Sequence, residues 1–95
     1  MVRILLVEDD ATVREAVAAY LTRAGHDVDP VADGEAAVEH FTARPADLVL
    51  LDLMLPGLGG LEVARRLRSM RRDLPLIMVT ARGQEHERVQ GLQHG

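Results

Sequence analysis

The chain has 95 residues, of which 47 % are hydrophobic and 27 % charged, and its formal net charge is −4 at pH 7. This composition excludes a disordered segment, whose signature is low hydrophobicity with high net charge, and the length suits a single domain with one core. The modest negative charge, and the absence of a basic stripe with interleaved aromatic residues, argue against direct contact with nucleic acid.

Cysteine and lysine are both absent, and all 11 basic residues are arginine. The absence of cysteine removes disulfides, thiolate catalysis and cysteine-based zinc sites from consideration. No apolar run approaches the ~20 residues of a membrane span, and the first apolar stretch runs into three acids instead of a cleavage site. We therefore expect a cytoplasmic protein without membrane contact.

The first 25 residues predict a strand followed by a helix. Residues 3–7 form a near-continuous apolar run that ends in three carboxylates, which is typical of a parallel strand covered on both faces. Residues 12–15 have the pattern of a capping box, and Gly25 ends the helix that follows. The side chains at helical spacing, which we expect to face the core, are Val13, Ala16, Val17, Tyr20, Leu21 and Ala24.

A weaker strand and a second helix come next. Residues 27–32 predict a strand, and Pro30 favours an edge position because proline has no N–H for a ladder. Asp33 is expected to cap a helix from Gly34 to about Arg44. Its predicted inward residues are Ala37, Val38 and Phe41.

The remaining pattern repeats the alternation of strand and helix. Residues 47–53 predict a buried strand, 61–70 a helix, 74–80 a fourth strand and 84–94 a weak helix. The inward side of the helix at 61–70 is expected to carry Leu61, Ala64 and Leu67. Arginines at 65, 66, 68, 71 and 72 fit a solvated helix face, with a docking patch as the alternative. Alternating strands and helices imply βαβ units with a parallel sheet.

Acidic and hydroxyl side chains stand where three of these strands end. They are Glu8, Asp9 and Asp10 after the first strand, Asp52 after the third and Thr80 after the fourth. In open α/β sheets the ligand site forms beyond the carboxyl ends of the strands. If the first and third strands are neighbours, their carboxylates converge, and the repulsion between them favours a divalent cation with hard oxygen ligands, Mg²⁺ or Mn²⁺.

Asp52 is the best placed nucleophile toward phosphorus, because it stands alone at the end of a central strand. Glu8 and Asp9 share one turn and are suited to hold the ion, and the Thr80 hydroxyl can hydrogen-bond a phosphoryl oxygen. Each residue alone is as readily a surface acid or a capping side chain. Together they favour a phosphoryl-accepting site, with Asp10 expected to be a helix N-cap or an exposed acid.

Three segments resemble a known family. Residues 4–10 (ILLVEDD), 50–57 (LLDLMLPG) and 77–81 (IMVTA) are similar, in order and spacing, to the signatures of receiver domains of two-component response regulators. The segment around Pro56 and the helix after it most resemble receivers attached to winged-helix transcription factors. The resemblance covers essentially the whole chain and implies a flavodoxin-like (CheY-like) fold, a doubly wound parallel sheet of strand order 2-1-3-4.

The resemblance also implies roles for particular residues. Glu8 and Asp9 would be the acidic pair, with Asp9 a direct Mg²⁺ ligand, and Asp52 would be both phosphoacceptor and ligand. The backbone carbonyl of Met54 would supply a third protein oxygen, and Thr80 would be the switch hydroxyl. The implied partners are a sensor histidine kinase and, in the full-length protein, an effector DNA-binding domain. Beyond its own phosphotransfer and dephosphorylation, such a domain is not an enzyme.

Receiver domains continue with a fifth strand that bears a lysine, and with a fifth helix, and neither pattern is present. We therefore expect residues 1–95 to be a single, C-terminally truncated receiver domain. The fourth strand would then be an exposed edge, which favours pairing with another copy or aggregation.

Two other functions remain open from the sequence. One is an interaction or dimerisation fragment that has kept the site but lost phosphorylation-coupled signalling. The other is a free-standing phosphohydrolase, which is disfavoured because Leu53 and Met54 follow Asp52 where such enzymes need a further acid/base carboxylate.

Overall fold

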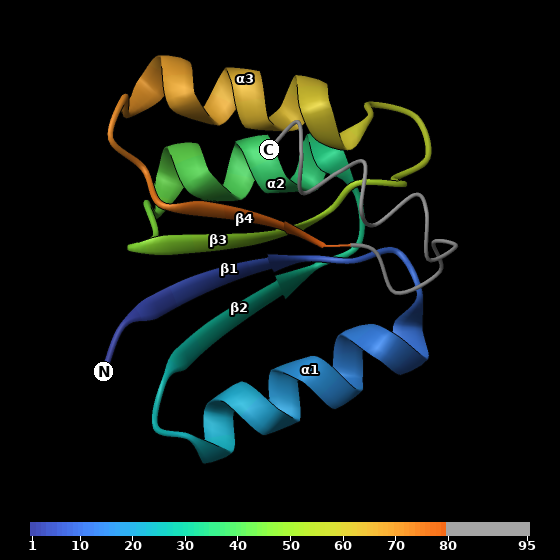
Figure 1. The fold of residues 1–95 in the computed structure, drawn as a ribbon, viewed down its shortest axis with the longest axis vertical. Helices are drawn as coiled ribbons and strands as arrows, with labels where there is room; N and C mark the ends of the chain where they lie inside the picture. The colour runs from blue at the N-terminus through green and yellow to red at the C-terminus, as the bar shows by residue number, and fades with distance from the viewer. Residues whose placement is uncertain (80–95) are drawn as a thin grey trace.

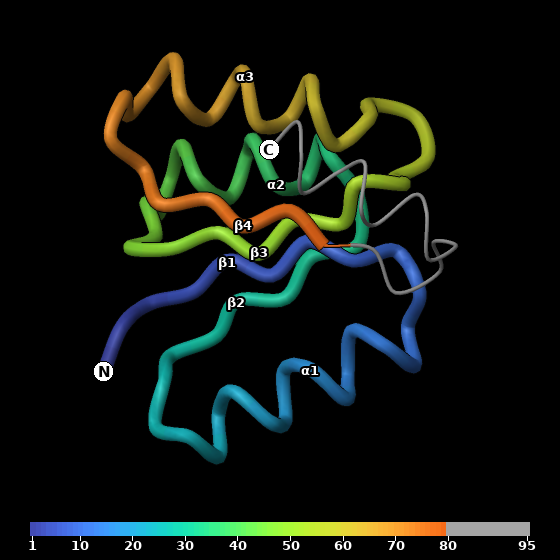
Figure 2. Tube along the Cα trace, viewed as in Figure 1, coloured from blue at the N-terminus to red at the C-terminus, as the bar shows by residue number. Residues whose placement is uncertain are grey.

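The computed structural model describes residues 1–79, which form a parallel sheet with helices on both faces (Figures 1 and 2). The strands are β1 (Arg3–Val7), β2 (Asp27–Val31), β3 (Leu48–Asp52) and β4 (Leu76–Val79), in the order β2-β1-β3-β4. The helices are α1 (Ala11–Arg23), α2 (Gly34–Ala43) and α3 (Gly60–Met70). In Figure 1, α2 and α3 cover one face of the sheet and α1 lies on the other.

The predicted strand order is confirmed, and so is the edge position of the strand that carries Pro30. The helix predicted at residues 84–94, and Thr80 at the end of the fourth strand, lie outside the described residues. Among residues 1–79, no helix has the length and apolar character needed to cross a membrane.

Strand register decides which side chains fill the main core. Val7 pairs with Leu51, and Leu51 with Met78, so that side chains in register share one face of the sheet. This row and the row of Leu5 and Val49 pack against α2 and α3. The buried cluster consists of Leu5, Val7, Ala37, Phe41, Ala46, Val49, Leu51, Leu55, Val63, Ala64, Leu67 and Leu74. The inward positions predicted for α2 are therefore confirmed.

The face of the sheet under α1 is covered only in part. No residue of α1 is fully buried, and Tyr20, which we expected to face the core, is 72 % exposed. Within the described residues α1 is the one helix on this face, so no neighbouring helix covers its flanks (Figure 1). An apolar hollow of about 300 Å³ remains between α1 and the sheet, with Val13, Val17 and Leu50 in its lining.

The outer strand β4 keeps apolar side chains on this same face. Ile77 and Val79 are 49 % and 47 % exposed, and β4 is the outermost strand beside β3 in the sheet of residues 1–79. Such an edge can pair with another chain. Association through this strand stays a prediction.

Aspartates begin the first two helices. Asp10 Oδ1 accepts the Val13 N–H at 3.1 Å, and Asp33 Oδ1 accepts the Ala36 N–H at 2.7 Å. Both caps agree with the sequence prediction. The predicted capping box at residues 12–15 is wrong, because Asp10 already caps the helix and Thr12 lies within its first turn.

The buried stripe of α3 contains two of the three residues predicted to face inward, Ala64 and Leu67. Val63, Ala64 and Leu67 are buried together with Gly60, which gives the i, i+3, i+4, i+7 spacing of a helix face. Leu61 lies beside this stripe and is 68 % exposed, so its predicted inward position is wrong.

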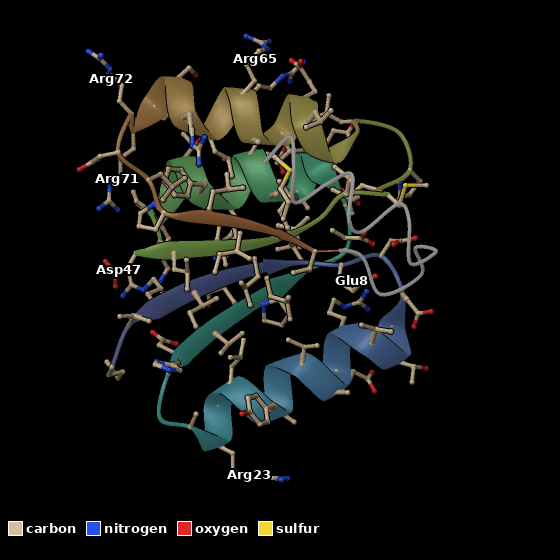
Figure 3. All side chains as sticks on the ribbon, viewed as in Figure 1. Glu8, Arg23, Asp47, Arg65, Arg71 and Arg72 are labelled. Atoms are coloured by element: carbon tan, nitrogen blue, oxygen red, sulfur yellow. The ribbon has the colours of Figure 1, made fainter. Side chains whose placement is uncertain are left out.

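The outer face of α3 carries arginines, several of which are paired locally. Arg65 and Arg66 both donate to the Glu62 carboxylate, and these bonds lower the pKa of Glu62 to about 2. Arg71 reaches back from the end of the helix to the Ala46 carbonyl oxygen at 3.0 Å. Figure 3 shows Arg65 pointing away from the sheet. This pairing supports the interpretation of a solvated helix face.

Gly60 allows α3 to begin directly against the end of β3. A Cβ atom at this position would lie 2.7 Å from the Asp52 carbonyl oxygen and 3.0 Å from the Leu53 Cα. Backbone atoms cannot move aside as the tip of a flexible side chain can, so any side chain here would push the helix away from the strand.

Replacing Gly60 by alanine is therefore expected to destabilise the fold by about 1–3 kcal/mol through overpacking, although the same change inside a helix normally stabilises it. Urea unfolding measures the free energy. Gly59→Ala is the control, because a Cβ at Gly59 meets nothing within 4 Å. The free energy of unfolding of Gly59→Ala should fall by less than about 1 kcal/mol, because alanine is only a weaker N-cap than glycine. Equal losses in the two variants would contradict the close approach.

Candidate functional site

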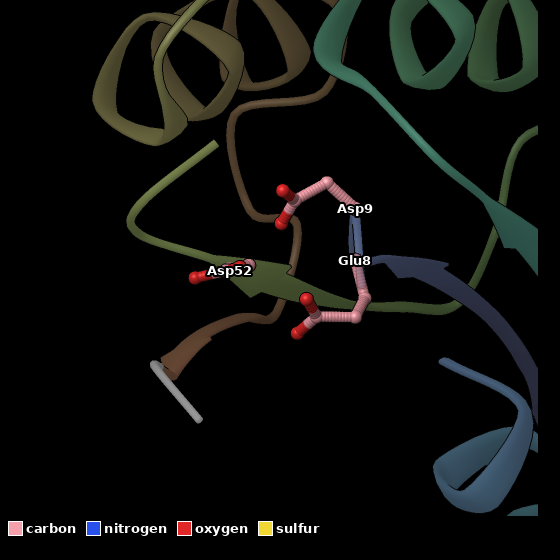
Figure 4. Close-up of side chains that lie close together, drawn as sticks. All are labelled: Glu8, Asp9 and Asp52. Atoms are coloured by element: carbon pink, nitrogen blue, oxygen red, sulfur yellow. The ribbon is translucent and has the colours of Figure 1, made fainter. Parts of the chain in front are cut away.

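Three of the carboxylates predicted to converge lie together at the carboxyl ends of β1 and β3 (Figure 4). One carboxylate oxygen from each of Glu8, Asp9 and Asp52 lies within 4.8 Å of the other two. The two strands are hydrogen-bonded neighbours, and the pairing of Val7 with Leu51 places the next positions side by side. Glu8 and Asp52 are 3 % and 1 % exposed, and Asp9 is half-buried, so the acids form a sheltered cluster.

Backbone bonds on both sides hold Glu8 in this cluster. Its N–H donates to the Val31 carbonyl oxygen at 3.1 Å, and its Oε2 accepts the Asp10 N–H at 3.0 Å. Burial raises the pKa of the Glu8 carboxyl, and the nearby charges of Asp52 and Asp9 raise it further, against the opposing effect of the Asp10 N–H. Glu8 therefore retains a proton to higher pH than a free glutamate.

Asp52 is oriented by the turn that follows β3. Its Oδ1 accepts the Met54 N–H at 2.9 Å, which brings the backbone of Met54 to the edge of the cluster. The neighbouring Leu53 N–H donates to the Val79 carbonyl oxygen at 2.9 Å and ties the end of β3 to the end of β4. The role of the Met54 carbonyl as a ligand stays a prediction.

Asp10 follows Asp9 in the chain but is not one of the three clustered acids. It caps α1, which is one of the two roles expected for this residue. Thr80 lies outside the described residues, and its role as a switch hydroxyl stays a prediction.

Sequence reasoning missed Arg14. Its Nη1 donates to the carbonyl oxygens of Glu8, at 2.9 Å, and Asp9, at 3.3 Å. The available signal was a cation near the start of a helix, where the helix dipole disfavours positive charge and a local partner is needed. That signal is weak, because hydrogen bonds to backbone carbonyls leave no pattern in the sequence.

The ligands of the cluster fit a hard divalent cation. All three side chains offer carboxylate oxygens, which suit Mg²⁺ or Mn²⁺, and Mg²⁺ is typically held by a few carboxylates with water and phosphate oxygens. Without a cation, like charges at such separations repel by a few kcal/mol per pair at an effective dielectric of about 20. Glu8, Asp9 and Asp52 are thus the residues that would hold the ion.

The fold and the acidic cluster together define a class, the doubly wound α/β proteins with a carboxylate site at the carboxyl ends of central strands. The sequence matches the family model of the response regulator receiver domain over residues 4–95. The chain therefore belongs to the response regulator receiver domain family.

Known relatives agree with this family. The transcriptional regulatory protein TcrA of Mycobacterium tuberculosis is 48 % identical over 94 residues, which cover 99 % of this chain and 37 % of TcrA. The sensory transduction protein RegX3 of Mycobacterium bovis is 44 % identical over 95 residues, which cover 100 % of this chain and 41 % of RegX3. The chain thus spans about two fifths of the length of these curated relatives.

A solved structure agrees with the fold. A chain in the crystal structure of histidine kinase ThkA in complex with response regulator protein TrrA superposes with a TM-score of 0.80 at 38 % identity. The match covers 90 % of this chain and 73 % of that chain. The predicted receiver family and its flavodoxin-like fold are therefore confirmed, as is the predicted similarity to transcriptional response regulators.

The raised pKa of Glu8 makes the stability of the metal-free chain depend on pH. Between the pKa of glutamate in the unfolded chain, about 4.3, and the higher pKa in the folded chain, the folded state binds the extra proton. Stability is therefore expected to fall as pH rises through this interval. Glu8→Gln, whose amide oxygen can accept the same Asp10 N–H, should abolish this loss and be more stable than the parent chain at pH 7.

Urea midpoints between pH 4 and pH 8, measured with and without Mg²⁺, check this expectation. The difference between parent and variant should vanish near pH 4, and Mg²⁺ should stabilise the parent more than the variant. A parent chain whose metal-free stability rises over the same interval while that of the variant stays flat would contradict the assignment to Glu8.

Proposed function

We propose that this chain is the phosphoacceptor of a two-component response regulator and takes a phosphoryl group from a sensor histidine kinase onto Asp52. The observation that carries the proposal is the position of Asp52, a buried carboxylate at a strand end whose oxygen lies within 4.8 Å of oxygens from Glu8 and Asp9. Similarity to a chain in a kinase–regulator complex supports a histidine kinase as the donor.

The transfer is a substitution at phosphorus. A carboxylate oxygen of Asp52 attacks the phosphorus of a phosphoimidazole, the P–O bond forms as the P–N bond breaks, and the leaving imidazole nitrogen takes up a proton. The Met54 N–H, bonded to Oδ1, fixes the rotation of the Asp52 carboxylate for this attack.

Glu8, Asp9 and Asp52 would hold Mg²⁺ or Mn²⁺, with the backbone carbonyl of Met54 as a further oxygen. When bound, the cation neutralises the carboxylates and the charge that develops on the phosphoryl oxygens. The same group of residues would support hydrolysis of the acyl phosphate by water, so the domain would catalyse its own phosphorylation and dephosphorylation.

The phosphoryl group carries about −1.5 to −2 charges in place of the single charge of the ionised Asp52 carboxylate, and this change would bias a two-state surface around Thr80. In the full-length protein this surface would act on an effector DNA-binding domain and regulate transcription in the cytoplasm, a role supported by the relatives TcrA and RegX3. The alternative of an interaction fragment would also keep the acidic cluster, so the cluster does not separate the two functions. The match to the receiver family and the similarity to transcriptional regulators favour the phosphoacceptor.

The expected result of incubation with Mg²⁺ and phosphoimidazole is a mass increase of one phosphoryl group, in a bond that hydroxylamine cleaves. Asp52→Asn should lose this product, because an amide is not a nucleophile toward phosphorus at neutral pH. Asp73→Asn is the matched control, since Asp73 is a surface acid with 86 % of its side chain exposed, and it should keep the product. Intact-mass spectrometry reads all three. Labelling that persists in Asp52→Asn would reject Asp52 as the acceptor.

A further inference from the structure

A side chain of α1, Arg14, donates hydrogen bonds to the turn that carries Glu8 and Asp9. Arg14 is half-buried near the start of α1, and its Nη1 donates to the Glu8 carbonyl oxygen at 2.9 Å and the Asp9 carbonyl oxygen at 3.3 Å. Hydrogen bonds from a guanidinium are charge-assisted and stronger than neutral ones. Both residues gripped in this way bear a carboxylate of the acidic cluster.

Other bonds close this turn into a small network. The Glu8 N–H is held by the Val31 carbonyl oxygen, and the Glu8 side chain accepts the Asp10 N–H. Asp10 in turn caps α1 and accepts the Arg14 N–H at 2.8 Å through its carbonyl oxygen. The backbone of Arg14 thus belongs to the first turn of the helix, while its side chain donates to the carbonyl oxygens of Glu8 and Asp9. The turn is therefore connected to β2 on one side and to α1 on the other.

We propose that Arg14 is a positioning residue, which fixes the carbonyl groups of Glu8 and Asp9 so that their carboxylates meet Asp52 around one divalent cation. This inference rests on the proposed function of the cluster. Partners that orient metal ligands without touching the metal typically change metal affinity by ten- to a hundred-fold when they are removed. Arg14 meets this description, since it binds the backbone of two candidate ligands.

The direction in which Mg²⁺ affinity changes when Arg14 is replaced distinguishes a positioning role from a simple effect of its charge. On charge alone, removing a cation beside three carboxylates would strengthen the binding of a divalent metal ion. If Arg14 positions the turn, its removal lets the two carboxylates move, and the binding becomes weaker. The two explanations therefore predict opposite changes.

The test measures Mg²⁺ affinity by calorimetric titration of the parent chain and of Arg14→Gln. Arg23→Gln is the matched control, because Arg23 is exposed in the last turn of the same helix, far from Glu8, and its replacement removes the same charge (Figure 3). We expect Arg14→Gln to bind Mg²⁺ about ten-fold more weakly than the parent, and Arg23→Gln to bind it as the parent does.

Two further measurements distinguish a change at the acidic cluster from a general loss of folding. Carbonyl ¹³C resonances of Glu8 and Asp9 in the metal-free chain should shift in Arg14→Gln and stay in place in Arg23→Gln. Arg14→Lys keeps the charge and one donor group but lacks the planar fork of the guanidinium, so its affinity should lie between those of the parent and Arg14→Gln.

A folded Arg14→Gln chain that binds Mg²⁺ as tightly as the parent, or more tightly, would overturn the role of Arg14 and leave the proposed function standing. Full parental affinity in Arg14→Lys would overturn it as well, if Arg14→Gln failed to fold. A parent chain that binds no Mg²⁺ would instead remove the proposed function itself, on which this inference depends.

Discussion

Burial of like charges at one point is the constraint on which the rest of this structure depends. Glu8 and Asp52 are almost fully buried, although an ionised carboxylate without a compensating partner is among the most unfavourable groups to bury. Each receives one backbone N–H, from Asp10 and Met54, which offsets part of the desolvation. A divalent cation would offset the repulsion that remains. The metal-free chain is therefore destabilised by the same carboxylates that would bind the ion.

The apolar core is what forces these charges together. Val7 and Leu51 are in register and fully buried against α2 and α3, and the next position on each strand is an acid. A slip of one residue between β1 and β3 would turn the apolar side chains out of the core, so hydrophobic burial fixes the register. The register in turn fixes the separation of Glu8 from Asp52. The geometry of the acidic cluster is thus determined by side chains that take no part in its chemistry.

Sequence patterns predicted the parts of the structure that follow from chain direction and strand burial. Parallel strands bring their carboxyl ends to one edge, so the meeting of Glu8, Asp9 and Asp52 could be predicted without coordinates. The errors arose where two local solutions compete. Asp10 and Thr12 are both good caps two residues apart, and the pattern does not say which one starts the helix. Leu61 has the more apolar side chain, yet the stripe with correct helical spacing passes through smaller residues beside it. Tyr20 was wrongly predicted to face the core, because the periodicity of one helix does not show how much of that helix neighbouring elements cover.

One backbone hydrogen bond suggests how a change of charge at Asp52 would affect the conformation of β4. The Leu53 N–H, one residue beyond Asp52, donates to the carbonyl oxygen of Val79, the residue that precedes Thr80 in the chain. The turn after Asp52 is therefore coupled to the end of β4 through the peptide that also leads to the Met54 N–H. Phosphorylation would convert the Asp52 carboxylate that accepts the Met54 N–H into an acyl phosphate with a larger and differently charged group, and the turn would have to adjust. In the proposed switch, a conformational change at Asp52 would thus reach β4 through backbone hydrogen bonds of the sheet and not through a series of side-chain contacts.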